Sequence, residues 1–264
     1  MNIWMREMRM AQKPLLLWCI GVILLVASGM AKYGGMSASG QSMQDLIAAM
    51  PKSLQVMMGM GGFDLSTARG YYGVLYLYLL LAVSIHAVML GANSIAREER
   101  DRTAEFLLAK PVSRHRVVGA KLAAAASQVL IVNAVSLAAS LQLVQYYSKG
   151  KEDLGPVAVL LGGMLLVQLL FLHLGACLAA AILPQRAAAA GAGILLITFF
   201  LSFLIQLNEN LACLRYITPF QYYEASRVLS SGRLEPVFVG LSLLLLGIFI
   251  ILTYAGFHKR DLRV

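Results

Sequence analysis

The chain has 264 residues, of which 59% are hydrophobic and only 13% are charged, and its mean hydropathy is +0.73. Soluble domains are about half apolar and about a quarter charged, so this composition excludes an ordinary soluble domain and a disordered chain, and it predicts a lipid environment. The net charge of +9 raises the question of nucleic acid, but the positions of the basic residues explain it by membrane topology.

Six apolar runs are long enough, or nearly so, to cross a bilayer, because a spanning helix needs about 20 mostly apolar residues. They cover residues 14–30, 71–95, 117–144, 156–182, 188–207 and 236–255. We therefore expect an all-α integral membrane protein with a single transmembrane domain over residues 1–264. Its longest outer connections are expected at residues 31–70 and 208–235.

The basic residues predict the orientation of these runs. With the N-terminus inside, the cytoplasmic segments hold 14 lysines and arginines and the outer segments hold 8. This excess favours both termini in the cytoplasm. The first 13 residues are expected to form a short amphipathic helix on the inner membrane surface, with Trp4, Met5 and Met8 toward lipid. A cleaved signal peptide is the alternative, disfavoured because the first run is long and is followed by five more.

The runs lack the groups that several kinds of membrane protein need. No acidic residue lies in the middle of a run, which disfavours a secondary transporter, since a coupled ion needs a partner at membrane depth. No nucleophile turn of the GxSxG type lies at that depth, and no GxxxxGK[ST] loop occurs. The three cysteines lie far apart and the four histidines form no cluster, so no metal ligand is assigned.

Neutral polar residues do occur within the runs. Asn93, Gln128, Asn133 and Gln168 are candidates for lining a pathway, and the alternative is hydrogen bonding between helices. His86 and His173 are interpreted as packed histidines, against the alternative of a proton relay. Small residues at positions 187, 189, 191 and 193 suit close helix packing within or between subunits.

Residues 97–116, between the second and third runs, are the most informative segment. The segment begins with a dense run of charges, continues with an apolar patch at 106–108, and reaches Pro111, which ends a helix. Ser113 is placed to cap the helix of the third run. Charges and a small apolar knob would face the cytoplasm, and a solvated linker is the alternative.

Three motifs resemble those of the type-2 ATP-binding-cassette permeases, the membrane subunits of exporters that have a separate ATPase. One is the 97–116 segment, in which Arg102 stands where the family commonly has glycine. The second is the first outer loop, from Met50 to Tyr72. The third is an outer-side turn formed by Thr218, Pro219, Phe220, Tyr222 and Tyr223. In the first motif the matching positions are Glu98, Glu99, Thr103, Glu105, Leu107, Leu108, Pro111, Ser113, Arg114 and Lys121.

The resemblance implies that the 97–116 segment is a cytoplasmic coupling helix that docks on the ATPase. It also implies two ATPase copies, which would hold ATP and magnesium, and a second permease subunit, identical or related. This chain would be no enzyme and would hold no cofactor. The cargo would be hydrophobic or amphipathic, exported across a bacterial plasma membrane. The candidate ATPase-coupling residues are Glu98, Glu99, Thr103, Glu105, Phe106, Leu107, Leu108, Pro111 and Arg114.

Two expectations remain open from the sequence. A membrane scaffold or signalling partner that transports nothing would keep the same topology, and it is the alternative function. The outer segment from Leu211 to Arg233 is too long for a hairpin between two runs and is rich in aromatic and polar residues. We expect it to form short re-entrant or interfacial helices, and a plain surface loop is the alternative.

Overall fold

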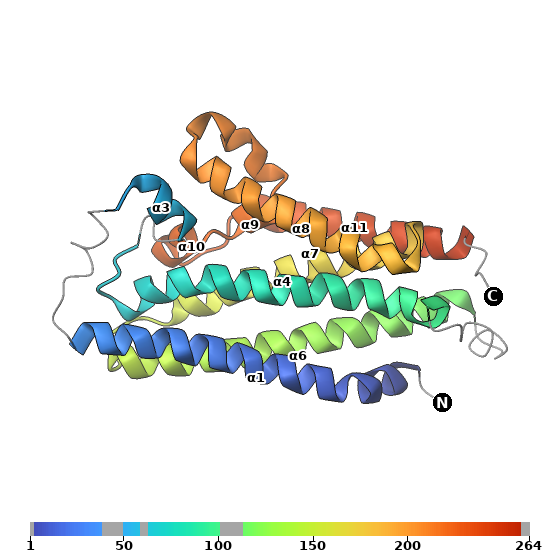
Figure 1. Ribbon diagram of the computed structural model, residues 1–264, viewed down its shortest axis with the longest axis horizontal. Helices are drawn as coiled ribbons and strands as arrows, with labels where there is room; N and C mark the ends of the chain where they lie inside the picture. Colours follow the sequence, from blue (N-terminus) through green and yellow to red (C-terminus); the bar gives the residue numbers. More distant parts are fainter. Residues whose placement is uncertain (1–2, 39–49, 59–62, 101–112, 260–264) are drawn as a thin grey trace.

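The computed structural model describes residues 3–38, 50–58, 63–100 and 113–259, and within these ranges every regular element is a helix (Figure 1). Six helices are long: α1 (Ile3–Ala38), α4 (Ala68–Arg100), α6 (Arg114–Ser148), α7 (Gly155–Ala181), α8 (Pro184–Leu207) and α11 (Pro236–Lys259). The short ones are α3 (Lys52–Met57), the 3-10 helix η1 (Glu209–Tyr216), α9 (Pro219–Tyr222) and α10 (Ala225–Ser231).

All six long helices are apolar and long enough to cross a membrane. The prediction of an all-helical chain with six such helices is therefore confirmed. Each predicted run lies within one of these helices, except that the run 156–182 extends one residue past the end of α7. The short helices η1, α9 and α10 confirm that the outer segment from Leu211 to Arg233 is helical in part and is not a plain loop.

The long helices pack side by side, with α4 and α7 at the centre of the bundle. Helix α4 contacts α1, α6, α7 and α8, and α7 also contacts α6, α8 and α11. Helix α1 begins and α11 ends at the same end of the bundle, which we call the N-terminal end (Figure 1). The opposite end carries α3, η1, α9 and α10. Two termini at one end are what an even number of crossings produces.

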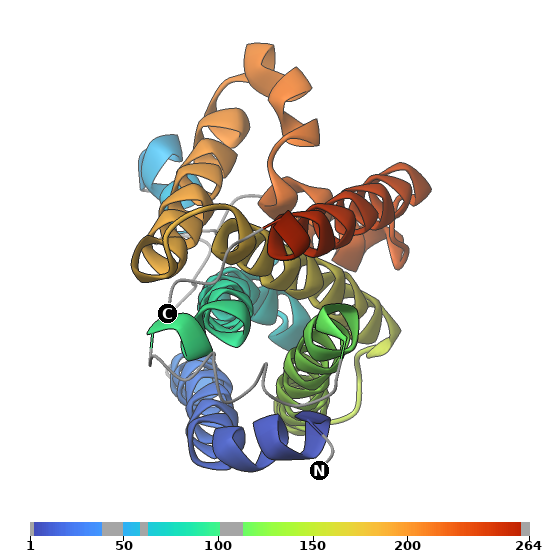
Figure 2. The same ribbon diagram turned by 90° about the vertical axis from the view of Figure 1, so that its right-hand side faces the viewer.

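Helix α1 departs from the expected arrangement. The sequence predicted a separate short helix before Pro14, whereas α1 is one helix of 36 residues that contains Pro14. Its first turns bend across the N-terminal end of the bundle (Figure 2). Proline lacks an amide proton and crowds the preceding turn, so it bends a helix without always ending it.

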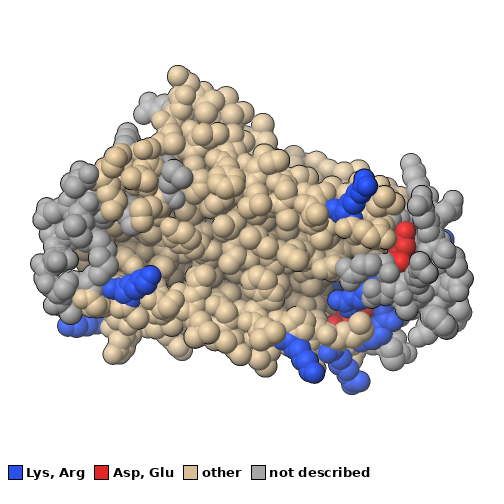
Figure 3. All heavy atoms as spheres, in the orientation of Figure 1, with Lys and Arg blue, Asp and Glu red and all other residues tan. Residues whose placement is uncertain are grey.

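The surface has the polarity expected of a protein in lipid. On the face drawn in Figure 3, coloured Lys, Arg, Asp and Glu side chains lie toward the two ends, with an uncharged band between them. Large apolar side chains face outward on the peripheral helices, such as Leu17 of α1, Ile197 of α8 and Ile251 of α11, each 68% exposed. A water-facing surface would not expose them in such numbers.

Candidate functional site

The predicted coupling segment lies between the end of α4 and the start of α6. Residues 101–112 are outside the described residues, so Thr103, Glu105, Phe106, Leu107, Leu108 and Pro111 remain predictions. Glu98 and Glu99 lie in the last turn of α4, and Arg114 begins α6. The hydroxyl of Ser113 accepts a hydrogen bond from the amide of Arg116 at 3.3 Å, which confirms the predicted cap of α6.

The first turns of α1 connect to both helices that flank this segment. A carboxylate oxygen of Glu7 lies 3.4 Å from the guanidinium of Arg97 in α4, and the other lies 2.8 Å from Arg6. The indole of Trp4 donates to the hydroxyl of Ser127 in α6 at 3.2 Å. The indole N–H of Trp4 therefore has an acceptor on a neighbouring helix, and contact of its ring with lipid stays a prediction.

Helices α4 and α6 are also joined directly at the N-terminal end. Lys121 is buried, and its ammonium group donates to the backbone carbonyl of Ser94 in α4 at 2.7 Å. The ring of His115, in the first turn of α6, stacks against Tyr254 and His258 of α11 with centroids 5.7 and 5.5 Å away. The start of α6 is thus held between α4 and α11.

Sequence reasoning missed the role of Glu7. It is the one acid in the basic first segment, and only 6% of its surface is exposed. An acid is rarely buried unless it is paired, which explains its position between Arg6 and Arg97. A single carboxylate within a basic amphipathic segment was the available signal.

The four candidate pathway residues lie in four different settings. Asn133 donates to the carbonyl of Leu161 in α7 at 3.3 Å, which is a bond between helices, and Gln128 reaches the carbonyl of Ala124 in its own helix at 3.4 Å. Asn93 is half-buried in α4. Gln168 is completely buried, and neither its amide nitrogen nor its amide oxygen has a hydrogen-bond partner among the described residues. A role in lining a pathway stays a prediction for all four.

Two buried glycines allow α4 and α7 to approach closely. A β-carbon added to Gly91 would lie 1.8 Å from the carbonyl oxygen of Leu172, and one added to Gly175 would lie 2.1 Å from that of Val88. These distances are far below van der Waals contact, so only glycine fits. The sequence does not reveal these positions, because it does not say which helices pair.

The predicted small-residue face is divided. Ala187 is buried, and Gly191 of α8 packs on Val88 of α4, so these two serve packing within the chain. Ala189 is exposed, and Gly193 has open space around its α-carbon.

The two histidines within the long helices, His86 and His173, have different surroundings. The His86 ring packs on Trp18 of α1 at 4.7 Å, and Nδ1 of His173 bonds the carbonyl of Leu169 at 2.8 Å.

The outer-side turn is built into the core at the other end of the bundle. The ring of Phe220 lies between Phe171 of α7 and Phe199 of α8, at 5.4 and 5.2 Å. The hydroxyl of Tyr223 lies 3.2 Å from the carbonyl of Phe238. Thr218 stands at the N-cap position of α9, Pro219 is its first residue, and the Tyr222 ring stacks on Phe238 at 5.2 Å. Burial raises the pKa of Tyr222 to about 12, so its hydroxyl stays neutral.

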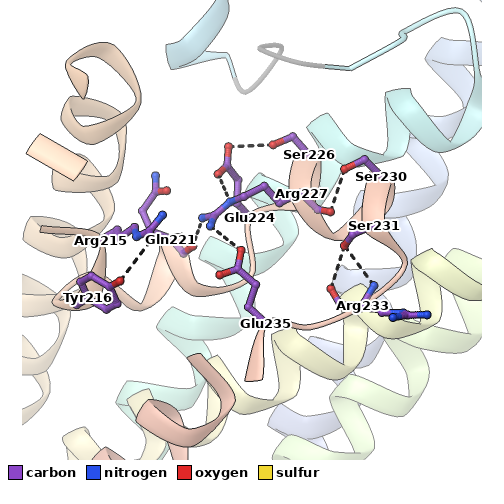
Figure 4. Close-up of polar contacts among 10 residues, drawn as sticks. All are labelled: Arg215, Tyr216, Gln221, Glu224, Ser226, Arg227, Ser230, Ser231, Arg233 and Glu235. Carbon is purple, nitrogen blue, oxygen red and sulfur yellow. Dashed lines mark hydrogen bonds and ion pairs between the residues drawn. The ribbon is translucent and has the colours of Figure 1, made fainter. Parts of the chain in front are cut away.

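Arg227 of α10 organises the polar part of this region (Figure 4). Its guanidinium reaches carboxylate oxygens of Glu224 at 2.9 Å and Glu235 at 3.0 Å, and it donates to the carbonyl of Gln221 at 2.6 Å. Gln221 in turn donates to the carbonyl of Ser202 in α8 at 2.8 Å. The network joins α8, α9, α10 and the residue before α11, so the outer segment is attached to the bundle at several points.

These features define a multi-pass helical membrane protein with charged groups concentrated at its ends. The chain belongs to the family described as ABC-2 family transporter protein, whose family model matches residues 1–262. The resemblance found in the sequence is thereby confirmed. A comparison with curated proteins finds no match. Members of this family are membrane transport subunits that work with an ABC ATPase and are not themselves the ATPase.

Proposed function

We propose that this chain is the membrane-spanning subunit of an ATP-driven exporter and forms half of its translocation pathway. The observation that carries the proposal is the family match over residues 1–262, on a chain with six apolar helices of spanning length. The complex contains a second permease subunit and two copies of a cytoplasmic ATPase, which bind ATP and magnesium. The cargo is hydrophobic or amphipathic, and the location is a bacterial plasma membrane.

The 97–116 segment carries the contact with the ATPase in this proposal. Its acidic residues face a complementary rim on the ATPase, and Phe106 to Leu108 fill an apolar pocket. The surroundings of the segment support a mechanical role, because α1, α4 and α6 are joined to one another beside it. The ion pair of Glu7 with Arg97 joins α1 to α4. The hydrogen bonds of Trp4 with Ser127 and of Lys121 with Ser94 join α1 to α6 and α6 to α4. A displacement of the segment would therefore move α1, α4 and α6 together.

A membrane scaffold that transports nothing is the alternative function. It shares the topology but needs no ATPase bound at the 97–116 segment.

Affinity purification from the native membrane in mild detergent separates the two functions. The tagged chain is expected to bring down an ABC ATPase in roughly equal amount and with ATP hydrolysis. The double variant Glu98→Lys with Glu99→Lys is expected to lose both. Lys32→Glu with Lys151→Glu, at two exposed positions on the opposite end, is the matched control and keeps both. Recovery of the chain alone, or equal recovery with both double variants, contradicts the proposal.

A further inference from the structure

A cavity of about 300 Å³ lies beside the outer-side turn, and nothing described so far uses it. Helix α7 forms its floor with Phe171 and Leu174, α8 and α11 form its walls with Ile194 and Phe249, and the turn between η1 and α9 covers one end. Figure 2 shows α8 and α11 diverging on either side of α7, with η1 arching above them.

Each polar side chain that lines the cavity already takes part in a hydrogen bond within the protein. Of the polar lining residues, Thr198 donates its hydroxyl to the carbonyl of Leu195 at 2.8 Å, and Tyr222 donates to the carbonyl of Tyr216. The hydroxyl of Tyr216 accepts from Arg215 at 3.2 Å. The other lining side chains are apolar. Because the hydroxyls are already bonded, the cavity favours hydrocarbon over a polar molecule.

The helices that form the walls of the cavity expose large apolar side chains on the protein surface. On α8 and α11, which form the walls, Ile197 is 68% exposed and Leu244 is 61% exposed. Of the six long helices, α11 is the least buried within the chain. A molecule that enters between these helices must therefore come through the hydrocarbon of the bilayer.

A cationic group stands at the rim beside this apolar space. The guanidinium of Arg215 lies 5.2 Å from the centre of the Tyr216 ring, which lines the cavity (Figure 4). It also lies 5.7 Å from the centre of the Phe238 ring. Arg227 is held by two carboxylates, whereas Arg215 forms no ion pair with a carboxylate in the described part of the chain. Arg215 therefore keeps donors available for an anion, and guanidinium suits phosphate.

We infer that this cavity binds a membrane phospholipid, with one acyl chain between α7, α8 and α11 and the phosphate on Arg215. The apolar lining and the apolar outer surface of α8 and α11 match the acyl chains of such a molecule, and the nearby cation matches its phosphate. The inference requires only that the chain lies in a membrane. It does not depend on the direction of transport or on the ATPase.

Photocrosslinking tests the site directly. The purified chain is placed in phosphatidylcholine nanodiscs that contain a phosphatidylglycerol with a diazirine at the end of one acyl chain, and the labelled residues are mapped by mass spectrometry. On the unaltered protein we expect label concentrated on cavity residues such as Leu174 and Ile194. Label spread evenly over the outward faces of α8 and α11 would overturn the inference, and this arm needs no variant to fold.

Two variants and one control distinguish the contribution of the acyl chain to binding from that of the headgroup. Ile194→Phe with Thr198→Phe fills the cavity and is expected to reduce labelling at Leu174 at least fivefold, whereas Ile197→Phe, on the outward face of the same helix, leaves it unchanged. Arg215→Gln is expected to reduce labelling by the phospholipid but not by a photoreactive diacylglycerol, which has no phosphate. Equal labelling of Leu174 in all variants, or equal effects of Arg215→Gln on both probes, overturns the assignment. A cysteine at Ile194 that forms a disulfide between two copies of the chain also overturns it.

Discussion

Glu152, in the connection between α6 and α7, accepts a hydrogen bond from the backbone amide of Ala68 at 3.0 Å and so caps the start of α4 from 84 residues away. Its second carboxylate oxygen accepts from the amide of Arg69 at 2.8 Å. The first amides of a helix have no partner within the helix, and a negative charge there also complements the helix dipole. The contact thus attaches the start of the central helix α4 to the connection between α6 and α7.

Replacement of Glu152 by alanine is therefore expected to destabilise the protein by about 1–2 kcal/mol, the cost of a lost helix cap. Glu152→Gln, which keeps one acceptor oxygen, should lose less. The measurement is the thermal unfolding midpoint in detergent. Lys151→Ala, at the exposed neighbouring position, is the control, and equal midpoints for Glu152→Ala and Lys151→Ala would refute the cap.

Gly91→Ala is expected to force α4 away from α7, because the new β-carbon would meet the carbonyl oxygen of Leu172 at 1.8 Å. Overpacking of a core costs about 1–3 kcal/mol, and a clash with backbone belongs at or above the upper end of that range. Gly193→Ala makes the same chemical change where nothing lies within 4 Å, so it should be neutral or stabilising. Yield of folded protein and its unfolding midpoint compare the two. If both alanines behave alike, the close α4 to α7 approach is not as described.

Glu7→Gln removes the charge that joins α1 to Arg97. The pair is partly buried, so the loss of stability should lie between the roughly 0–1 kcal/mol of an exposed ion pair and the roughly 3–5 kcal/mol of breaking a buried one. We also expect lower ATP hydrolysis by the purified complex, because Arg97 begins the 97–116 segment. The control is Arg9→Gln, at an exposed position of the same helix. If Glu7→Gln changes neither the stability nor the ATP hydrolysis, then α1 plays no part in coupling.

The three native cysteines provide a test of topology. Cys213 is exposed in η1, whereas Cys19 and Cys177 are half-buried in long apolar helices. A membrane-impermeant maleimide added to intact cells should therefore label Cys213 and spare the other two. In a Cys213→Ser background, a cysteine at the exposed Arg116 should react only after the membrane is opened. Labelling of the Arg116→Cys protein from outside would reverse the predicted orientation.

The helices could be predicted from the sequence because lipid imposes a minimum apolar length, which the six runs meet or nearly meet. Ser113 was predictable as a cap because it directly precedes α6 and bonds an amide only three residues away. The bend of α1 was not, because apolar runs reveal which residues suit lipid but not whether a helix continues through Pro14.

The candidate site was predictable only where its signal is local. The outer-side turn combines a proline with neighbouring aromatic residues, and the structure buries these aromatics against Phe171 of α7, Phe199 of α8 and Phe238 of α11. The partners of Trp4, Glu7 and Lys121 on other helices lie 27 to 123 residues away, so they depend on which helices pack together. The same reason hides the close approach at Gly91 and the capping of α4 by Glu152.

The central claim is that residues 97–116 dock on a separate ATPase, and site-specific crosslinking at Phe106 tests it most directly. A photoreactive phenylalanine analogue at this position, irradiated in native membranes, should capture a protein that mass spectrometry identifies as an ABC ATPase, in an amount that changes when ATP is added. The same analogue at Ile217, an exposed residue at the opposite end, should capture none. Capture of lipid alone at Phe106, or of the ATPase equally from both positions, would contradict the account.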